Sequence, residues 1–372
     1  MVLSRQLFLG AIGAAFVTAA LGTQACETPE TSAEDPRPVL SELASNVVVP
    51  GFAAFDAEAE VLRAALADAA RNPTEPTVTR ARDAFFRARA AWKRTEGFRI
   101  GPPEIDTWKA SIDFWPASPD AIAKAIAMPG QHTKESVAAL GANAKGFMAI
   151  EYVLFDSSTE HTSVLPALTT ASDAVARRAY LVALGEALRA DAARFHDLWR
   201  TEGKNLGKEL AEGTGFFVST KVATDQLVRQ ACFAAIALES THIGKPLGRQ
   251  NGGTPVPSLE ESPRSDGSLR DLASALEGIS AVYLGLGARD GLGLSDLVRA
   301  RSAVSDDHVV GHLAATRKAI SDIPPPLRVS LLRDTAKVQA AFEASRALKT
   351  SLTTEVVSAL GTTLTFSDSD GD

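Results

Sequence analysis

Apolar residues recur at every third or fourth position through most of the chain, with polar residues between them. This spacing places the apolar residues on one face of a helix, and no alternating run is long enough for a buried sheet. The pattern therefore predicts an all-α protein built from two helical bundles in tandem. The predicted helices are Val39–Asn72, Thr77–Glu96, Pro119–Ala127, Thr133–Phe155, Ser172–Glu202, Thr220–Gly244, Ser268–Leu284, Ser295–Ala300, Asp306–Ile323 and Leu327–Leu360.

Proline and glycine mark the predicted interruptions. Pro50 and the glycine after it predict a kink in the first helix, and Pro324–Pro326 predict a rigid break near the end. Residues 97–119 are predicted to be irregular over a length that is more typical of a functional loop than of a plain connection. Residues 248–267, with three prolines, predict a second loop.

The N-terminus has the composition of a secretory signal. Arg5 precedes an apolar run, Leu7–Gly22, that is shorter than the roughly 20 residues of a membrane-spanning helix. Cys26 follows at the position where a bacterial lipoprotein is cleaved and acylated. Either a lipid on Cys26 or an uncleaved signal anchor is therefore expected to hold the chain at a membrane. Both versions place the folded part in the cell envelope, in the periplasm or at the outer membrane.

Composition agrees with a folded chain of two parts. The 372 residues are 45% hydrophobic and 22% charged, which allows a sizeable core and about two domains. The net charge of −7, without a basic stripe interleaved with aromatics, argues against a nucleic-acid partner. Two cysteines are too few for a disulfide framework, and Cys232 is expected to be buried. The predicted parts are a signal peptide (1–25), a linker (26–38), an N-terminal bundle (39–157), a C-terminal bundle (158–366) and an acidic tail (367–372).

One carboxylate interrupts an apolar helix face in the stretch KGFMAIEYVLFD. At helical spacing Glu151 shares its face with Phe147, Met148, Leu154 and Phe155. A buried carboxylate without a partner costs roughly several kcal/mol, or it takes up a proton. Glu151 is therefore expected to face a partner or a ligand.

Four stretches, in order along the chain, resemble the imelysin family, the insulin-cleaving membrane protease group of bacterial envelope proteins. They are AWKRTEGFRIGPPEIDTWKASIDFWP (Ala91–Pro116), KGFMAIEYVLF (Lys145–Phe155), HIGKPLG (His242–Gly248) and ESPRSDGSLRDLASALEGISAVYLG with the GLSDL that follows (Glu261–Leu297). The resemblance implies two four-helix bundles with a site in the cleft between them. It also implies an envelope protein from a group classed as metallopeptidases, many of whose members are connected with iron. The family's hallmark is G-x-H-x-x-E, and here Met148 stands in place of the motif histidine, between the matching Gly146 and Glu151.

Met148 weakens the metal chemistry that the resemblance implies. His and Glu three positions apart on a helix can ligate one metal ion, but a thioether suits soft Cu(I) rather than Zn²⁺ or Fe³⁺. Glu151 alone is too few ligands, and the chain has no HExxH motif. His242, three positions after Glu239, could restore a ligand or could complement the dipole of a helix end. If the protein binds a metal ion, Fe or Zn, the candidate ligands are therefore Glu151 and His242.

The segments that resemble the family suggest the surroundings of Glu151. Arg99 is its favoured partner, and the predicted ligand-binding cleft consists of Glu96, Arg99, Asp113, Trp115 and Met148. Such a cluster has two interpretations, a structural ion pair or a site for a cation or a polar ligand.

The favoured function is an exported imelysin-like protein that binds a metal ion or a small or peptide ligand without catalysis, in a role connected with iron or metal uptake. A metal-dependent peptidase is the alternative, although the incomplete motif argues against activity. A third interpretation is an interaction protein whose site has decayed.

Overall fold

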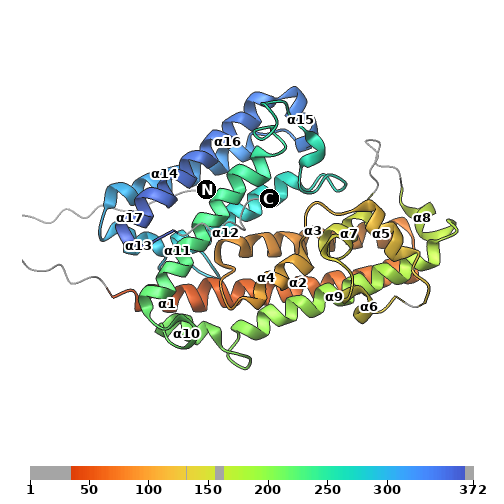
Figure 1. Cartoon of the computed structure of the whole chain (residues 1–372), viewed down its shortest axis with the longest axis horizontal. Helices are drawn as coiled ribbons and strands as arrows, with labels where there is room; N and C mark the ends of the chain where they lie inside the picture. The colour runs from red at the N-terminus through yellow and green to blue at the C-terminus, as the bar shows by residue number, and fades with distance from the viewer. Residues whose placement is uncertain (1–34, 131, 156–162, 365–372) are drawn as a thin grey trace, which may run out of the picture. The chain divides into compact units, whose positions relative to one another are not determined.

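The computed structural model describes residues 35–130, 132–155 and 163–364, and the regular elements there are helical (Figure 1). The predicted all-α class is confirmed, since the described residues contain no strand beyond an isolated bridge between Leu286 and Asp290. The α-helices are α1 (Arg37–Glu42), α2 (Val49–Arg71), α3 (Glu75–Arg94), α4 (Glu104–Ile112), α5 (Pro119–Ile126), α6 (Lys134–Ala138), α7 (Gly146–Leu154), α8 (Leu165–Thr169), α9 (Ala174–Trp199), α10 (Leu206–Glu212), α11 (Thr220–Ile236), α12 (Ser268–Leu284), α13 (Leu294–Arg299), α14 (Ala303–Ser321), α15 (Leu327–Arg333), α16 (Thr335–Thr350) and α17 (Val357–Leu360). The π-helical turns are η1 (Leu43–Val48), η5 (Ala237–Gly244) and η7 (Ser351–Val356), and the 3₁₀ turns are η2 (Thr95–Phe98), η3 (Ala142–Ala144), η4 (Gly215–Phe217) and η6 (Pro257–Leu259).

Several predicted features lie outside the described residues. They are the signal peptide, Cys26, most of the linker and the acidic tail. The boundary predicted between residues 157 and 158 falls in the gap 156–162 as well. Beyond that gap, α9 packs along α2 and against α6 and α7, so helices from both sides of the boundary share one core. Contacts group all residues from Asp35 onward as one compact unit, and the division into two bundles stays a prediction.

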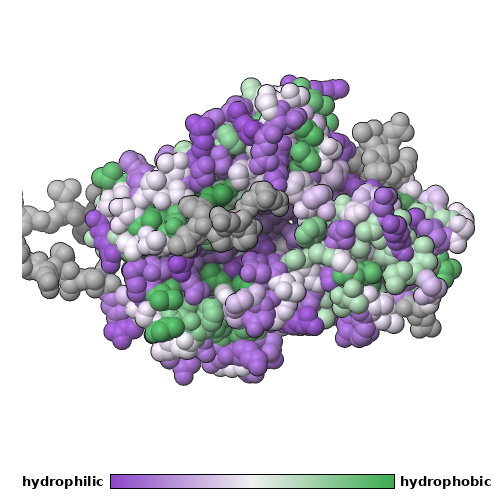
Figure 2. Space-filling view, in the orientation of Figure 1, coloured by the Kyte–Doolittle hydropathy of each residue, from purple (hydrophilic) through white to green (hydrophobic). Residues whose placement is uncertain are grey.

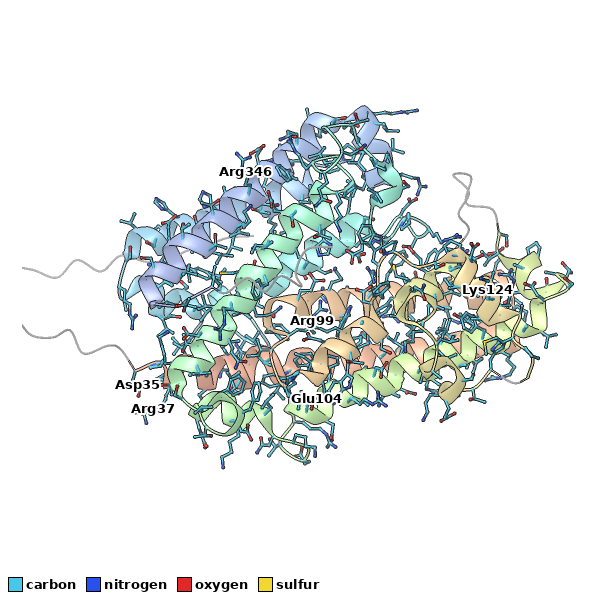
Figure 3. All side chains as sticks on the ribbon, viewed as in Figure 1. Asp35, Arg37, Arg99, Glu104, Lys124 and Arg346 are labelled. Carbon is cyan, nitrogen blue, oxygen red and sulfur yellow. The ribbon has the colours of Figure 1, made fainter. Side chains whose placement is uncertain are left out.

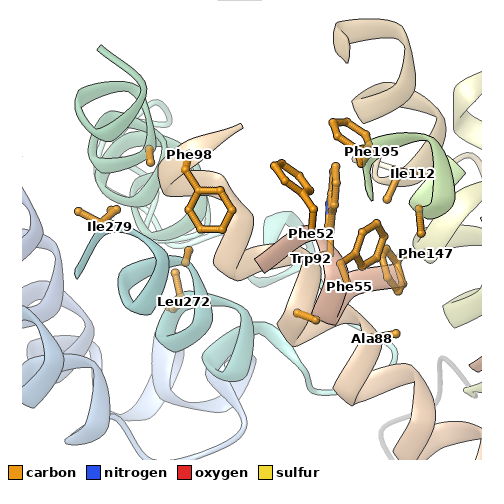
Figure 4. Close-up of a cluster of buried hydrophobic side chains, with 14 of the residues drawn as sticks. Phe52, Phe55, Ala88, Trp92, Phe98, Ile112, Phe147, Phe195, Leu272 and Ile279 are labelled. Carbon is orange, nitrogen blue, oxygen red and sulfur yellow. The ribbon is translucent and has the colours of Figure 1, made fainter. Parts of the chain in front are cut away.

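An aromatic core joins the long helices α2, α3 and α9 (Figure 4). The Phe52 ring stacks on the rings of Phe195 and Trp199, with centroids 5.3 and 5.8 Å apart. The Phe55 ring lies 5.0 Å from that of Trp92, and all five side chains are buried. Burying a large apolar side chain contributes about 1.5–3 kcal/mol. This core fixes α3, whose C-terminal end carries the polar residues described below.

The first helical run, Arg37–Arg71, is interrupted by the wide turn η1 just before Pro50, where the sequence predicts a kink. Proline has no N–H, so the Asn46 carbonyl four residues earlier is free of the α-helical ladder. That carbonyl accepts a hydrogen bond from the Ala288 N–H at 3.1 Å, and the Asn46 amide donates to the Gly285 carbonyl at 3.0 Å. By length and composition the run could cross a membrane, but half of its apolar window is buried in the fold.

The helix predicted over Thr133–Phe155 is wrong in extent. The chain forms three short elements there, α6, η3 and α7, because Gly146 adopts a positive φ of 69° that a continuing helix does not allow. A Cβ at Gly146 would lie 2.2 Å from the carbonyl oxygen of Ile112. Glycine at this position therefore lets α7 begin against the end of α4.

Two further predictions are corrected. The helix predicted over Leu327–Leu360 is divided at Asp334, whose φ of −124° and ψ of 34° are not helical. The segment 97–119, predicted to be irregular, contains the end of η2 and the helix α4. Pro103 is the residue before α4, where a missing N–H costs no helical hydrogen bond.

The end of α3 and the middle of α12 approach each other at two glycines. A Cβ on Gly278 would lie 2.0 Å from the Arg94 carbonyl oxygen, and one on Gly97 would lie 2.4 Å from the Gly278 carbonyl oxygen. Both positions therefore need a residue without a side chain.

We expect Gly278→Ala to lower the free energy of unfolding by about 1–3 kcal/mol, the usual cost of overpacking. Alanine favours a helix by about 1 kcal/mol over glycine, so propensity alone predicts the opposite sign. The control is Gly311→Ala in α14, where a Cβ would meet nothing within 4 Å and should stabilise slightly. Urea unfolding of both variants measures the effect, and a stabilised Gly278→Ala would contradict the close approach.

Candidate functional site

Two cations of α3, Arg89 and Lys93, are buried at the centre of the site, with 1% of each side chain exposed. The guanidinium of Arg89 contacts three carboxylates, those of Asp113 at 2.9 Å, Asp271 at 2.8 Å and Glu261 at 3.2 Å. The carboxylates come from the end of α4, from α12 and from the loop before α12. Arg89 thus connects three segments that are far apart in the sequence.

The Lys93 ammonium lies between two carboxylates. It contacts Glu96 and donates to both oxygens of Glu261, at 2.9 and 3.1 Å. Arg99 contacts the same Glu96 oxygen, Oε1, at 3.1 Å, and its guanidinium lies 4.0 Å from the centre of the Trp92 ring. Arg99 lies among the inner side chains, whereas Arg346 and Lys124 are on the outside (Figure 3).

His242, in η5, completes the group. Its Nδ1 lies 3.1 Å from Glu261 and its Nε2 lies 3.5 Å from Glu96. Burial lowers the pKa of His242 and Lys93 lowers it further, but the two carboxylates outweigh both and raise the pKa to about 9. The imidazole is therefore protonated at neutral pH.

The cluster is balanced in charge. Burial raises the pKa of Glu96 and of Glu261, but Lys93 and His242 outweigh it and hold both pKa values below the usual range. Four cations thus face four carboxylates, and we call this set the ion cluster. Its members are Arg89, Lys93, Arg99, His242, Glu96, Asp113, Glu261 and Asp271.

Glu151 lies beside the ion cluster with a different partner from the one predicted. Its Oε1 accepts hydrogen bonds from the Ser265 N–H at 3.0 Å and from the Ser265 hydroxyl at 2.5 Å. The prediction that Arg99 pairs with Glu151 is wrong, because Arg99 is held by Glu96 and stacked on Trp92. Burial raises the pKa of Glu151 to about 7, against the lowering effect of the Ser265 hydrogen bond.

A cavity of about 350 Å³ opens beside Glu151, and we call it the Trp115 pocket. Its lining includes Trp115, Met148, Glu151, Tyr152, Glu261 and Arg264. Met148 is 3% exposed and belongs to the hydrophobic core as well. Carboxylate Glu261 belongs to both the pocket and the ion cluster, so the two features form one site.

The predicted residues thus divide between two neighbouring features. Trp115, Met148 and Glu151 line the pocket, while Glu96, Arg99, Asp113 and His242 join the ion cluster. Glu239, three positions before His242, pairs instead with Lys349 at 3.1 Å. Four residues of the site were not predicted from the sequence. They are the buried cations Arg89 and Lys93 and their acidic partners Glu261 and Asp271. Arg89 and Lys93 are four and eight residues after the buried Phe85, a spacing that places all three on one helix face.

This donor set does not fit a metal ion as it is arranged. A metal ligand must be a free carboxylate or a neutral imidazole, but Lys93 occupies the space between Glu96 and Glu261, and His242 is protonated. The described part of the chain contains no group of three or more His, Cys, Asp or Glu side chains placed to hold a metal. Glu151 and His242 as metal ligands therefore stay a prediction without support from this geometry.

Comparison with known proteins decides the family. The family model described as Imelysin, a peptidase family, matches residues 48–355. The chain belongs to the imelysin family. Iron-regulated protein A of Synechococcus elongatus is 27% identical over 339 residues, which cover 89% of this chain and 86% of that protein.

Two solved structures show the same fold. One, from Parabacteroides distasonis, is named after the precursor of iron-regulated protein A, with a TM-score of 0.75 and 20% identity. It is matched over 90% of this chain and 97% of its own. The other is an imelysin-like protein from Psychrobacter arcticum, with a TM-score of 0.70 and 16% identity over 90% of this chain and 98% of its own. At these sequence identities the similarity shows a shared fold and nothing about function.

Proposed function

We propose that this imelysin-family chain is a non-catalytic binding protein of the cell envelope that takes a small ligand in the Trp115 pocket, in a role connected with iron. The iron connection is supported by the name of the Synechococcus relative, Iron-regulated protein A. Residence in the periplasm or at the outer membrane, through a lipid on Cys26 or a signal anchor, is part of the same proposal. The ligand is a small molecule or a short peptide segment.

The observation that carries this proposal is the position of the Lys93 ammonium. A metallopeptidase uses carboxylates and neutral imidazoles to hold an ion with an open coordination position. Here Lys93 and Arg89 already neutralise the carboxylates that could act as metal ligands. Each of these two cations contacts at least two of those carboxylates. A metal ion would have to displace a buried cation, so binding fits these residues better than metal-dependent hydrolysis.

A pocket of this size and lining suits ligand binding. Small-molecule sites have volumes of about 300–1,000 Å³ and combine apolar walls with a few polar groups. The Trp115 pocket has about 350 Å³, apolar walls from Trp115, Met148 and Tyr152, and the carboxyl of Glu151. Figure 2 shows hydrophobic and hydrophilic residues interspersed over the visible face of the molecule.

Metal content and peptide cleavage test the proposal against the peptidase alternative. We expect the purified full chain to hold well under one equivalent of metal and to cleave peptides no faster than Glu151→Ala. A matched variant, Met148→His, adds an imidazole one helical turn before Glu151, so Zn²⁺ should raise its melting temperature and leave that of the natural chain unchanged. Stoichiometric Fe or Zn together with cleavage that Glu151→Ala abolishes would establish the alternative, a metal-dependent peptidase.

A further inference from the structure

Two cations lie over aromatic rings of the Trp115 pocket, and one of them, Arg264, also lines the cavity. The Arg264 guanidinium lies 4.3 Å from the centre of the Tyr152 ring, and Arg264 and Tyr152 both line the pocket. The Lys245 ammonium lies 5.4 Å from the centre of the Trp115 ring. Within the described residues, no carboxylate forms an ion pair with either cation. Both are half-buried, which makes an unneutralised charge more effective than at an open surface.

The acids of the pocket do not offset these two charges. The Glu261 carboxylate is already shared among Lys93, Arg89 and His242 in the balanced ion cluster. The Glu151 carboxyl, in turn, is buried and accepts two hydrogen bonds from Ser265, so at most one carboxylate faces two cations here. The pocket therefore has a positive excess, although the chain as a whole carries a net charge of −7.

From this arrangement we infer that the Trp115 pocket binds a small organic anion, whose carboxylate or phosphate group is held by Arg264 and Lys245. Its apolar part lies against Trp115, Met148 and Tyr152. This inference rests on the proposed binding function and adds the ligand's charge class to it. Guanidinium groups stacked on aromatic rings keep their N–H edges free, and those edges match the oxygens of carboxylate and phosphate.

The same chemistry accounts for a connection with iron without metal ligands from the protein. Fe³⁺ held by a polycarboxylate chelator is an anionic complex whose ligands to the metal are its own oxygens. A positive pocket with aromatic walls would recognise the periphery of such a complex. Chelated iron is then cargo, and neither Glu151 nor His242 needs to reach the metal.

A binding panel with one matched pair of variants tests the inference. The probes are citrate, the citrate complex of Fe³⁺, phenyl phosphate and inorganic phosphate, with trimethyl citrate as the neutral control and choline as the cationic control. Calorimetry on the full chain at low and high salt should give binding of at least one organic anion that weakens with salt. Arg264→Gln should weaken it about tenfold, the typical effect of one charge-assisted hydrogen bond.

The control variant is Arg270→Gln. The Arg270 guanidinium lies 4.2 Å from the centre of the Phe86 ring, so it makes the same kind of contact, but neither Arg270 nor its aromatic partner Phe86 lines the pocket. We expect the affinity of this variant for the anion to remain within a factor of about two of the natural chain, since the charge of an exposed residue outside the pocket is largely screened. Lys245→Gln should weaken binding like Arg264→Gln, and inorganic phosphate alone should bind weakly because it lacks an apolar part.

The outcomes separate this inference from the proposed function. If trimethyl citrate or choline binds as well as the anions, or if Arg264→Gln and Arg270→Gln behave alike, the anion inference is wrong and small-ligand binding stands. Binding of inorganic phosphate alone, without any organic anion, would also overturn the inference. If no probe binds, the anion inference is wrong and the proposed binding of a small ligand stands. If the chain proves to be a metal-dependent peptidase, the proposed function fails, and this inference fails with it.

Discussion

Replacing Arg89 with methionine is expected to lower the free energy of unfolding by about 3–5 kcal/mol, the usual cost of breaking a buried ion pair. Its guanidinium contacts Asp113, Asp271 and Glu261, and the side chain is 1% exposed. Methionine fills a similar volume but leaves three carboxylates with one cation fewer, in a place where water cannot replace it. Urea unfolding at neutral pH measures the loss.

Arg87→Met is the matched control for this prediction. Arg87 lies on the same helix, two residues earlier, with half of its side chain exposed and a 3.2 Å contact to Glu58. Exposed ion pairs contribute about 0–1 kcal/mol, so this variant should remain close to the natural chain. Equal losses in the two variants would mean that Arg89 acts through helix propensity or bulk rather than through its three carboxylates.

The two buried cations illustrate how far the sequence could predict this site. α3 carries many arginines, at positions that face water as well as the core, and a stretch such as FFRARAAWKR is typical of a solvent-exposed helix with an apolar stripe. Helical spacing from Phe85 places Arg89 and Lys93 on the inner face. Apart from Glu96, three residues after Lys93, the carboxylates that make this burial tolerable lie 24 to 182 residues away in the sequence, and periodicity carries no information about them.

For α7, too, helical periodicity predicted the buried face but not the partner of Glu151, which is distant in the sequence. The apolar face with Glu151 in its middle was predicted correctly, and Phe147, Met148 and Leu154 are buried with it. The partner was predicted wrongly because Ser265 is 114 residues further along the chain. Ser265 is positioned by the turn before α12, where Asp266 has a positive φ of 55°. A turn conformation of this kind in a non-glycine residue has no signature in the helical pattern.

The last prediction concerns pH. In the unfolded chain a glutamate has its ordinary pKa of 4.5, whereas burial raises the pKa of Glu151 to about 7 in the folded chain. Its contribution to stability is therefore fully present below pH 4.5 and is lost as the pH rises through about 7, because the folded state holds the proton more tightly. A difference of this size corresponds to roughly 3 kcal/mol between the two ends of the window.

Glu151→Gln should remove this part of the pH dependence. Glutamine keeps an oxygen that can accept from the Ser265 N–H, so at about pH 5 the variant should be nearly as stable as the natural chain. At about pH 8.5 it should be more stable, by roughly 3 kcal/mol, because no buried charge forms.

Urea unfolding at several pH values measures the difference in the free energy of unfolding between the variant and the natural chain. Burial also raises the pKa of Glu260 to about 7, but Glu260 is present in both proteins, so its contribution cancels in the difference. Glu104→Gln, at an exposed position of α4, is the control and should follow the natural chain at every pH. If Glu151→Gln lost stability equally at all pH values, the carboxyl would be needed in its charged form, and the desolvation that disfavours the charged form of Glu151 would be refuted.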